Sequence, residues 1–465
     1  MKHLEKSFYK RVFALMIPIL LQNGITNFVN MLDNLMVGQV GHPEMTGVSV
    51  VNQLIFVFAL CTFGAVSGAG IFGAQFFGSG DVKGLRDTFR FKIILCSLLS
   101  LGAIALFLLA GDRLVMLFLS GEGDPEVAQA AFGFSQGYLR VMLFSLVPFA
   151  LIQCFGSTLR ETGHTVPPMT AGIIAVFVNL VLNYALIFGH FGAPRMGVEG
   201  AALATVVSRF AELAIVVFWT YYKRSENKFI VGAFRSLRVP LALVRRILAK
   251  GLPLMLNELL WASGITVVNR LYSLRGLDVV AANNINYTFF NVFSVAFMSA
   301  GVAIGIILGQ MLGAGQREEA ISASKRLAVF SVVISVAVAG IYAAISGVIP
   351  GFYNTTDPVR KLATGLMLVC AATMPLEAYA SAVYFTLRSG GQALVTVIFD
   401  SGFVWAVSVP AAFIVERFTN LPIIAMYAIV QCLNLIKCLI GYLFYRTGRW
   451  AANIVSDPAP ATEEQ

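Results

Sequence analysis

The sequence predicts an all-α, polytopic membrane protein with twelve transmembrane helices in two pseudo-symmetric six-helix bundles. Three observations lead to this prediction. Hydrophobic residues make up 58% of the 465 positions and charged residues only 12%, which is about half the charged fraction of an average soluble domain. Apolar runs of bilayer-spanning length recur along the whole chain. The two halves of the sequence also match each other in one frame, which indicates an internal repeat.

This composition excludes several classes of protein. A soluble enzyme or a disordered chain would carry far more charge. A transmembrane β-barrel would alternate polar and apolar residues over about ten positions, and this chain does not. The net charge is +9. In a membrane protein such an excess reports topology before it reports an acidic partner, so we expect no nucleic-acid partner.

Twelve apolar segments can be placed in order. Each must be helical, because hydrocarbon offers no hydrogen-bond partner to a backbone amide. Several exceed the roughly 20 residues that cross a bilayer, so we expect them to tilt or to extend beyond it. In the first half the segments cover 13–37, 46–77, 91–111, 132–157, 167–189 and 200–222, and in the second half 251–272, 280–312, 327–349, 363–386, 393–415 and 421–445.

The longest polar stretch separates the sixth segment from the seventh. It predicts an N-terminal lobe over 1–222, a basic linker over 223–250 and a C-terminal lobe over 251–450, and the polar residues 451–465 predict a disordered tail. Positive loops stay in the cytoplasm. Placing the linker there puts both termini in the cytoplasm, with 23 of the 33 Lys and Arg residues on that side and 6 outside.

The internal repeat has one offset over about 60 residues. A shift of 235 residues aligns polar as well as apolar positions: Pro18 with Pro253, Asn34 with Asn269, Gly41 with Gly276, Gly70 with Gly305, Gln75 with Gln310, Gly78 with Gly313, and Gly80 with Gly315. Each half has six spans, so both halves enter the membrane from the same side and form parallel repeats. Two such lobes are expected to enclose a cleft that opens alternately to either side, which favours a secondary transporter.

A carboxylate at bilayer depth costs about 2.5–3.5 kcal/mol, so such residues normally face the bundle interior. Asp33 lies late in the first span, and Asn179 and Asn183 form an i,i+4 pair in the fifth. A carboxylate that faces amide oxygens can hold a proton or a hard cation such as Na⁺. The alternative is a buried Asp that joins helices through hydrogen bonds to Asn. We favour the functional interpretation, because an Asn side chain could join the helices through hydrogen bonds without the cost of a buried Asp.

The second half has its own midspan acids. Glu258 follows Pro253 by five residues, and Glu377 follows Pro375 by two. A carboxyl group in an apolar cavity can exchange protons near neutral pH. Alternatively, each Glu interacts with backbone groups that the nearby proline frees.

Other polar residues in the spans are open to two interpretations. Asn52, Gln53, Asn286 and Tyr287 occupy related repeat positions in the second and eighth spans and are candidates to line a substrate cleft. Individually, each is equally consistent with interhelical hydrogen bonding.

Two further acids have basic residues within reach. Glu212 lies three residues after Arg209, which favours a structural ion pair. Asp400 has Lys437 as a conceivable partner, and its role is open.

The sequence contains no motif of an enzyme or an ATP-driven pump. It lacks GxxxxGK[ST] and HExxH, and no Ser/His/Asp set is visible. We therefore expect no enzymatic activity and no cofactor, with H⁺ or Na⁺ as the coupling ion.

At this point the chain resembles the multidrug and toxic compound extrusion (MATE) transporters, in particular bacterial members, over about residues 5–450. The order and spacing of several glycine-rich pieces carry this resemblance. They are Pro18 with the stretch 33–41, Gln75 to Gly80, Asn179-Leu180-Val181-Leu182-Asn183 followed by Ile187-Phe188-Gly189, Gly197-Val198-Glu199-Gly200-Ala201-Ala202, and the stretch from Gly251-Leu252-Pro253 to Trp261.

The resemblance implies export of organic, usually cationic and amphipathic, compounds in exchange for H⁺ or Na⁺. It places the N-terminal cation site at Asp33, Asn179 and Asn183, completed by Thr205. Some members carry an acid where this chain has Asn183. This difference leaves open whether the coupling ion is H⁺ or Na⁺. In the C-terminal lobe the family's carboxylate corresponds to Glu377, and Glu258 lies about one turn before the family's usual glutamate.

The resulting hypothesis is a cation-coupled antiporter in the plasma membrane, monomeric, whose partners are small organic substrates and membrane lipids. One alternative is a lipid-linked saccharide flippase of the same superfamily, although those proteins commonly have more spans and a more cationic cavity. The other is a membrane protein of another class, such as an embedded enzyme or a sensor, which would need a nucleophile or a metal set.

Overall fold

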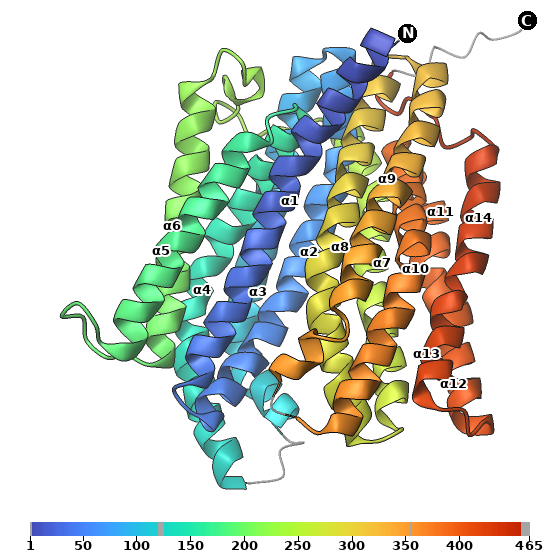
Figure 1. Cartoon of the computed structure of the whole chain (residues 1–465). Coiled ribbons are helices and arrows are strands. Elements are labelled where there is room, and N and C mark those ends of the chain that lie inside the picture. Colours follow the sequence, from blue (N-terminus) through green and yellow to red (C-terminus); the bar gives the residue numbers. More distant parts are fainter. Residues whose placement is uncertain (1, 120–124, 354, 457–465) are drawn as a thin grey trace, which may run out of the picture. The chain divides into compact units, whose positions relative to one another are not determined.

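The computed structural model describes residues 2–119, 125–353 and 355–456, without the side chains of residues 2–6, 30, 31, 34 and 35. The described residues form helices joined by short turns, with no strand among them (Figure 1). The α-helices are α1 (Lys2–Gly38), α2 (His42–Ser79), α3 (Val82–Leu119), α4 (Pro125–Glu161), α5 (Val166–Phe188), α6 (Val198–Tyr222), α7 (Leu241–Ser273), α8 (Leu277–Gly313), α9 (Arg317–Ile345), α10 (Asp357–Ser389), α11 (Ala393–Val397), α12 (Val409–Phe418), α13 (Ile423–Cys432) and α14 (Asn434–Arg446).

The described residues contain twelve helices that are long and apolar enough to cross a membrane. This confirms the predicted all-α class and the twelve spans. The eleventh span, Ala393–Phe418, combines α11 and α12 through two π-helical stretches, η3 (Ile398–Gly402) and η4 (Val404–Ser408). The twelfth span, Ile423–Arg446, combines α13 and α14. Several helices run past the predicted segments, because a helix that leaves the bilayer keeps its backbone hydrogen bonds.

The chain divides into two compact units. Unit 1 comprises 1–20, 71–81 and 246–465, and unit 2 comprises 21–70 and 82–245. The start of α1 and the end of α2 therefore pack with the second half of the sequence, and the rest of these two helices packs with the first half. Pro18 lies inside α1 close to this change of unit.

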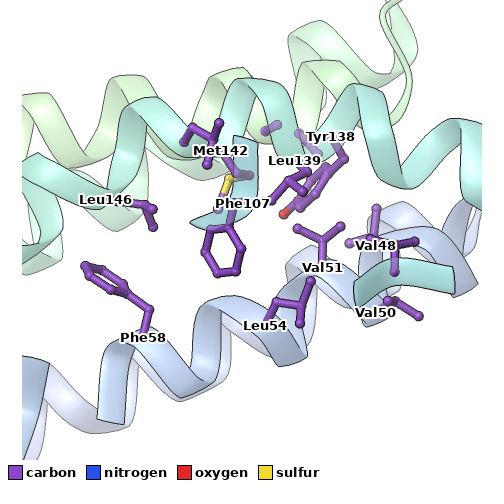
Figure 2. Close-up of a cluster of buried hydrophobic side chains, with 14 of the residues drawn as sticks. Val48, Val50, Val51, Leu54, Phe58, Phe107, Tyr138, Leu139, Met142 and Leu146 are labelled. Atoms are coloured by element: carbon purple, nitrogen blue, oxygen red, sulfur yellow. The ribbon is translucent and has the colours of Figure 1, made fainter. Parts of the chain in front are cut away.

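Unit 2 has a core formed by α2, α3 and α4. Figure 2 shows Phe107 from α3 among Leu54 and Phe58 from α2 and Met142 and Leu146 from α4. These side chains are buried, and each makes many close van der Waals contacts with its neighbours. The packing fixes the helices that carry the polar residues of the unit.

Unit 2 also buries an ion pair. Lys92 Nζ lies 2.6 Å from Glu161 Oε2, with 0% and 6% of the two side chains exposed. The ammonium group also donates to Ser157 Oγ at 3.0 Å and to Thr158 Oγ1 at 3.2 Å. Lys92 is one of the 23 Lys and Arg residues that the sequence assigns to the cytoplasmic side. The structure buries its side chain between α3 and α4.

Substituting Lys92→Met should strongly destabilise the protein. It would leave the Glu161 carboxylate buried without its ammonium partner, and breaking one side of such a pair costs about 3–5 kcal/mol. We expect a lower midpoint in thermal unfolding of the purified protein in detergent. The double variant Lys92→Met/Glu161→Gln should recover part of the loss, and a double variant less stable than Lys92→Met would contradict this explanation.

Candidate cation-binding site

The four residues predicted to form the N-terminal cation site lie together in unit 2. Asn183 Nδ2 donates to Asp33 Oδ1 at 2.7 Å and to Asn179 Oδ1 at 3.1 Å. Asn179 Nδ2 lies 3.3 Å from Thr205 Oγ1, whose hydroxyl donates to the backbone oxygen of Ala201 at 3.1 Å. The i,i+4 spacing on α5 therefore aims both amides at the carboxylate near the end of α1, while α6 closes the chain of contacts.

The contact between Asn179 and Asp33 has two chemical solutions. One terminal atom of the Asn179 amide lies 3.0 Å from both carboxylate oxygens of Asp33. With nitrogen at that place, an ionised Asp33 accepts two hydrogen bonds. With oxygen at that place, the two groups are compatible only when a proton or a cation lies between them. An ionised Asp33 therefore requires the amide nitrogen of Asn179 to face the carboxylate.

The surroundings of Asp33 add an aromatic hydroxyl and a cation. Tyr138 and Arg209 lie within electrostatic reach of the Asp33 carboxylate. The Tyr138 hydroxyl donates to Asn52 Oδ1 at 3.4 Å, so one of the predicted cleft residues borders this site. Arg209 makes the ion pair with Glu212 that their spacing predicts, at 2.9 Å.

The ligand chemistry near Asp33 fits a singly charged cation or a proton. The described residues contain no group of three or more His, Cys, Asp or Glu side chains that could hold a metal ion. A cation at Asp33 would therefore meet one carboxylate with amide and hydroxyl oxygens. Oxygen ligands of this kind suit a hard ion such as Na⁺, and the same carboxylate can bind a proton instead.

The two predicted C-terminal acids have different partners. Glu258 Oε1 accepts a hydrogen bond from the Tyr384 hydroxyl at 2.9 Å, and Arg388 donates to the same hydroxyl at 3.3 Å. Glu377 makes no hydrogen bond or ion pair with the described residues. Its charge interacts over a longer distance with Lys437.

Asp400 joins a separate pair in unit 1. Lys437 Nζ donates to Asp400 Oδ1 at 2.8 Å, which is the partnership considered from the sequence, and Asn257 Nδ2 donates to Oδ2 at 3.0 Å. Asn257 Oδ1 in turn accepts the backbone N–H of Ser401 at 3.2 Å. Asp400 and Ser401 both lie in the widened η3 turns, so the Asn257 side chain holds this irregular stretch to α7.

The other predicted cleft residues lie in different environments. Asn286 is buried and bonds Tyr342 and Tyr427, with its Nδ2 3.1 Å from the Tyr427 hydroxyl and its Oδ1 accepting from Tyr342 at 3.0 Å. This is the interhelical hydrogen bonding that the sequence left as an alternative. Gln53 and Tyr287 are exposed on their helices.

Sequence reasoning missed Tyr138, Asn257 and Tyr384. Aromatic and amide residues are common in apolar spans, so their type alone gave no signal. The spacing Tyr384 to Arg388, one turn apart on α10, could have marked the pair as neighbours. The partners across helices, such as Tyr138 with Asp33, depend on packing that no local pattern reports.

Comparison with known proteins places this geometry in context. The MatE family model matches residues 18–185 and 253–414. The chain is 25% identical over 451 residues to the "Probable multidrug resistance protein NorM" of Thermotoga maritima, covering 96% of this chain and 94% of the relative. It is 22% identical over 454 residues to the "Probable multidrug resistance protein YoeA" of Bacillus subtilis, covering 96% and 95%.

Solved structures share the fold at lower identity. One is described as the outward-facing conformation of a multidrug resistance MATE family transporter of the MOP superfamily, with a TM-score of 0.85, 19% identity, and coverage of 96% of this chain and 97% of that chain. A second is described as MATE in the bent conformation, with a TM-score of 0.85, 19% identity and 96% of both chains covered.

Proposed function

This chain belongs to the MatE family of multi-pass membrane transporters, and we propose that it is a secondary active antiporter that exports organic compounds in exchange for H⁺ or Na⁺. Its relatives are multidrug transporters and not enzymes. We further propose that the substrates are cationic and amphipathic, and that the monomer lies in the plasma membrane with both termini in the cytoplasm. The bias of Lys and Arg residues towards that side supports this orientation.

The observation that carries the proposal is the Asp33 site. A carboxylate within a predicted membrane span is costly unless it is paired or binds a proton or a cation, and it marks a functional site by default. Here Asn183 Nδ2 donates to the carboxylate at 2.7 Å, and a terminal atom of the Asn179 amide lies 3.0 Å from both of its oxygens. Binding of a proton or a cation at Asp33 would change the hydrogen bonds that join α1 to α5.

Such a switch can drive transport by coupling. The cation favours one arrangement of the two six-span halves and the substrate favours the other, so each ligand lowers the affinity for the other by the same factor. The repeat of two parallel halves supports alternating access as the way in which the substrate site changes sides.

Transport into proteoliposomes tests the function. Vesicles loaded with a fluorescent organic cation such as ethidium are given an inward gradient of H⁺ or of Na⁺, imposed separately. We expect one gradient to drive efflux of the dye beyond the rate in protein-free vesicles, and the effective gradient identifies the coupling ion. Efflux that neither gradient accelerates would contradict the antiporter.

A further inference from the structure

The ends of α2 and α8 cross within unit 1 with their backbones in direct contact. A Cβ atom added at Gly78 would overlap the backbone oxygen of Gln310, and one added at Gly313 would overlap that of Gln75. The repeat shift of 235 residues relates these two contacts. Only 0% of Gln75 and 5% of Gln310 is exposed, so both side chains must find hydrogen-bond partners inside the protein.

The same shift aligns Arg11 with Arg246, and here the two halves differ. Arg11 donates directly to the side-chain oxygen of Gln310. Arg246 donates to the backbone oxygen of Ile454, and the N–H of Ile454 donates to Gln75 Oε1 at 2.8 Å. Ile454, which follows the last span, therefore lies between Arg246 and Gln75. The equivalent pair, Arg11 and Gln310, is in direct contact.

Ile454 belongs to the C-terminal strap, which we define as residues 447–456. The strap lies across the end of unit 1 and is held mainly through its backbone, which needs no regular secondary structure. Its contacts are Gln75 Nε2 to the oxygen of Ala452 at 3.1 Å, Arg317 Nε to the oxygen of Ala451 at 2.9 Å, Arg317 NH2 to the oxygen of Gly448 at 3.2 Å, Gln392 Nε2 to the oxygen of Arg449 at 3.2 Å, and Asn453 Nδ2 to the oxygen of Gly313 at 3.3 Å.

Apolar packing fixes the strap as well. Trp450 is 1% exposed and stacks on Tyr445, with ring centroids 6.0 Å apart. Gly390 has no room for a Cβ because the Trp450 backbone oxygen lies there. The Ile454 side chain packs against a small cluster formed by Ile71, Leu254 and Ala393. The sequence places residues 451–456 in a disordered tail, whereas the structure packs them on this unit. The rest of that predicted tail, 457–465, lies outside the described residues.

We propose that the strap holds the α2–α8 crossing closed and so sets how readily this end of the protein opens. Gln75 is bonded to the strap on one side and to the backbone oxygen of Ser389 at 2.9 Å on the other, so moving α2 away from α8 breaks contacts of the strap with one of the two helices. Asn453 ties the strap to Gly313, the glycine of the same crossing. The inference rests on the proposed transport cycle, in which the end that carries the termini must open to admit substrate.

Hydrogen–deuterium exchange of the full-length protein in lipid nanodiscs tests the strap. The native protein should protect the amides of residues 450–456. Gln75→Leu should raise exchange in the strap and at both ends of the crossing, 74–80 and 309–315, by about tenfold or more, as expected when the three hydrogen bonds of this side chain are lost. Gln310→Leu is the matched comparison, because it removes the repeat-related glutamine, which accepts from Arg11, and it should raise strap exchange less than Gln75→Leu does.

A second pair of variants acts from the strap itself and leaves the spans intact. Ile454→Pro removes the N–H that Gln75 accepts, whereas Ile454→Ala keeps it. We expect exchange at the crossing to rise more in Ile454→Pro than in Ile454→Ala. Free exchange of the strap in the native protein would overturn the proposal. So would an unchanged crossing in both Gln75→Leu and Ile454→Pro. Exchange needs neither gradient nor substrate, so the vesicle assay decides the proposed function separately.

Discussion

Asp33→Asn should abolish gradient-driven export while the protein stays folded. Asparagine has the shape of aspartate and can keep a hydrogen bond to Asn183, which lies 2.7 Å from Asp33 Oδ1. It can neither release a proton nor supply the negative charge that attracts Na⁺. We expect efflux of an organic cation from loaded proteoliposomes to fall to the rate in protein-free vesicles under either gradient.

The control for this prediction is a second loss of a carboxylate at an unrelated place. Asp278 is exposed in the first turn of α8, and Asp278→Asn changes the net charge by the same amount. It should transport as the unchanged protein does. Thermal unfolding of Asp33→Asn should show a midpoint at least as high as that of the unchanged protein, because a buried neutral amide avoids the cost of a buried charge. Undiminished driven efflux in Asp33→Asn would remove this residue from the coupling mechanism.

Gly313→Ala should destabilise the α2–α8 crossing severely. The added methyl group would overlap the backbone oxygen of Gln75, which is not a flexible side-chain end that could turn away. Overpacking of this kind costs about 1–3 kcal/mol and sometimes more. We expect a lower midpoint of thermal unfolding, measured on purified protein in detergent, together with faster hydrogen exchange at 74–80.

A glycine elsewhere provides the matched control. Gly340 lies inside α9 with open space where a Cβ would be. There the same change should stabilise the helix by about 0.5–1 kcal/mol, because alanine has the higher helix propensity. Opposite signs at the two positions are therefore expected. Equal stabilisation at both would show that the backbones are not in contact at the crossing.

The sequence predicted most of the fold. Each span can be recognised from the length of its apolar segment, and it must be helical because lipid leaves a backbone amide without a hydrogen-bond partner. It also predicted that Asp33 lies beside Asn183, since the i,i+4 spacing of Asn179 and Asn183 defines one helix face and the cost of Asp33 draws attention to it. It could not pair Glu258 with Tyr384, because such contacts depend on how separate helices pack. Nor could it predict the strap, since Trp450 and Ile454 occur in a short polar stretch whose composition is typical of a frayed end.

The strap also bears on the ancestry of the chain. Two identical six-span halves, fused head to tail, would form the Arg11–Gln310 contact twice, at equivalent places. A fused chain has a single carboxyl terminus, so an appended peptide can serve one of those places and not the other. Ile454 therefore marks a departure from twofold symmetry between the two halves. A circular permutant with its new termini in the 223–250 linker would join the present termini covalently. It would show whether the strap still binds at this place when it is an internal loop.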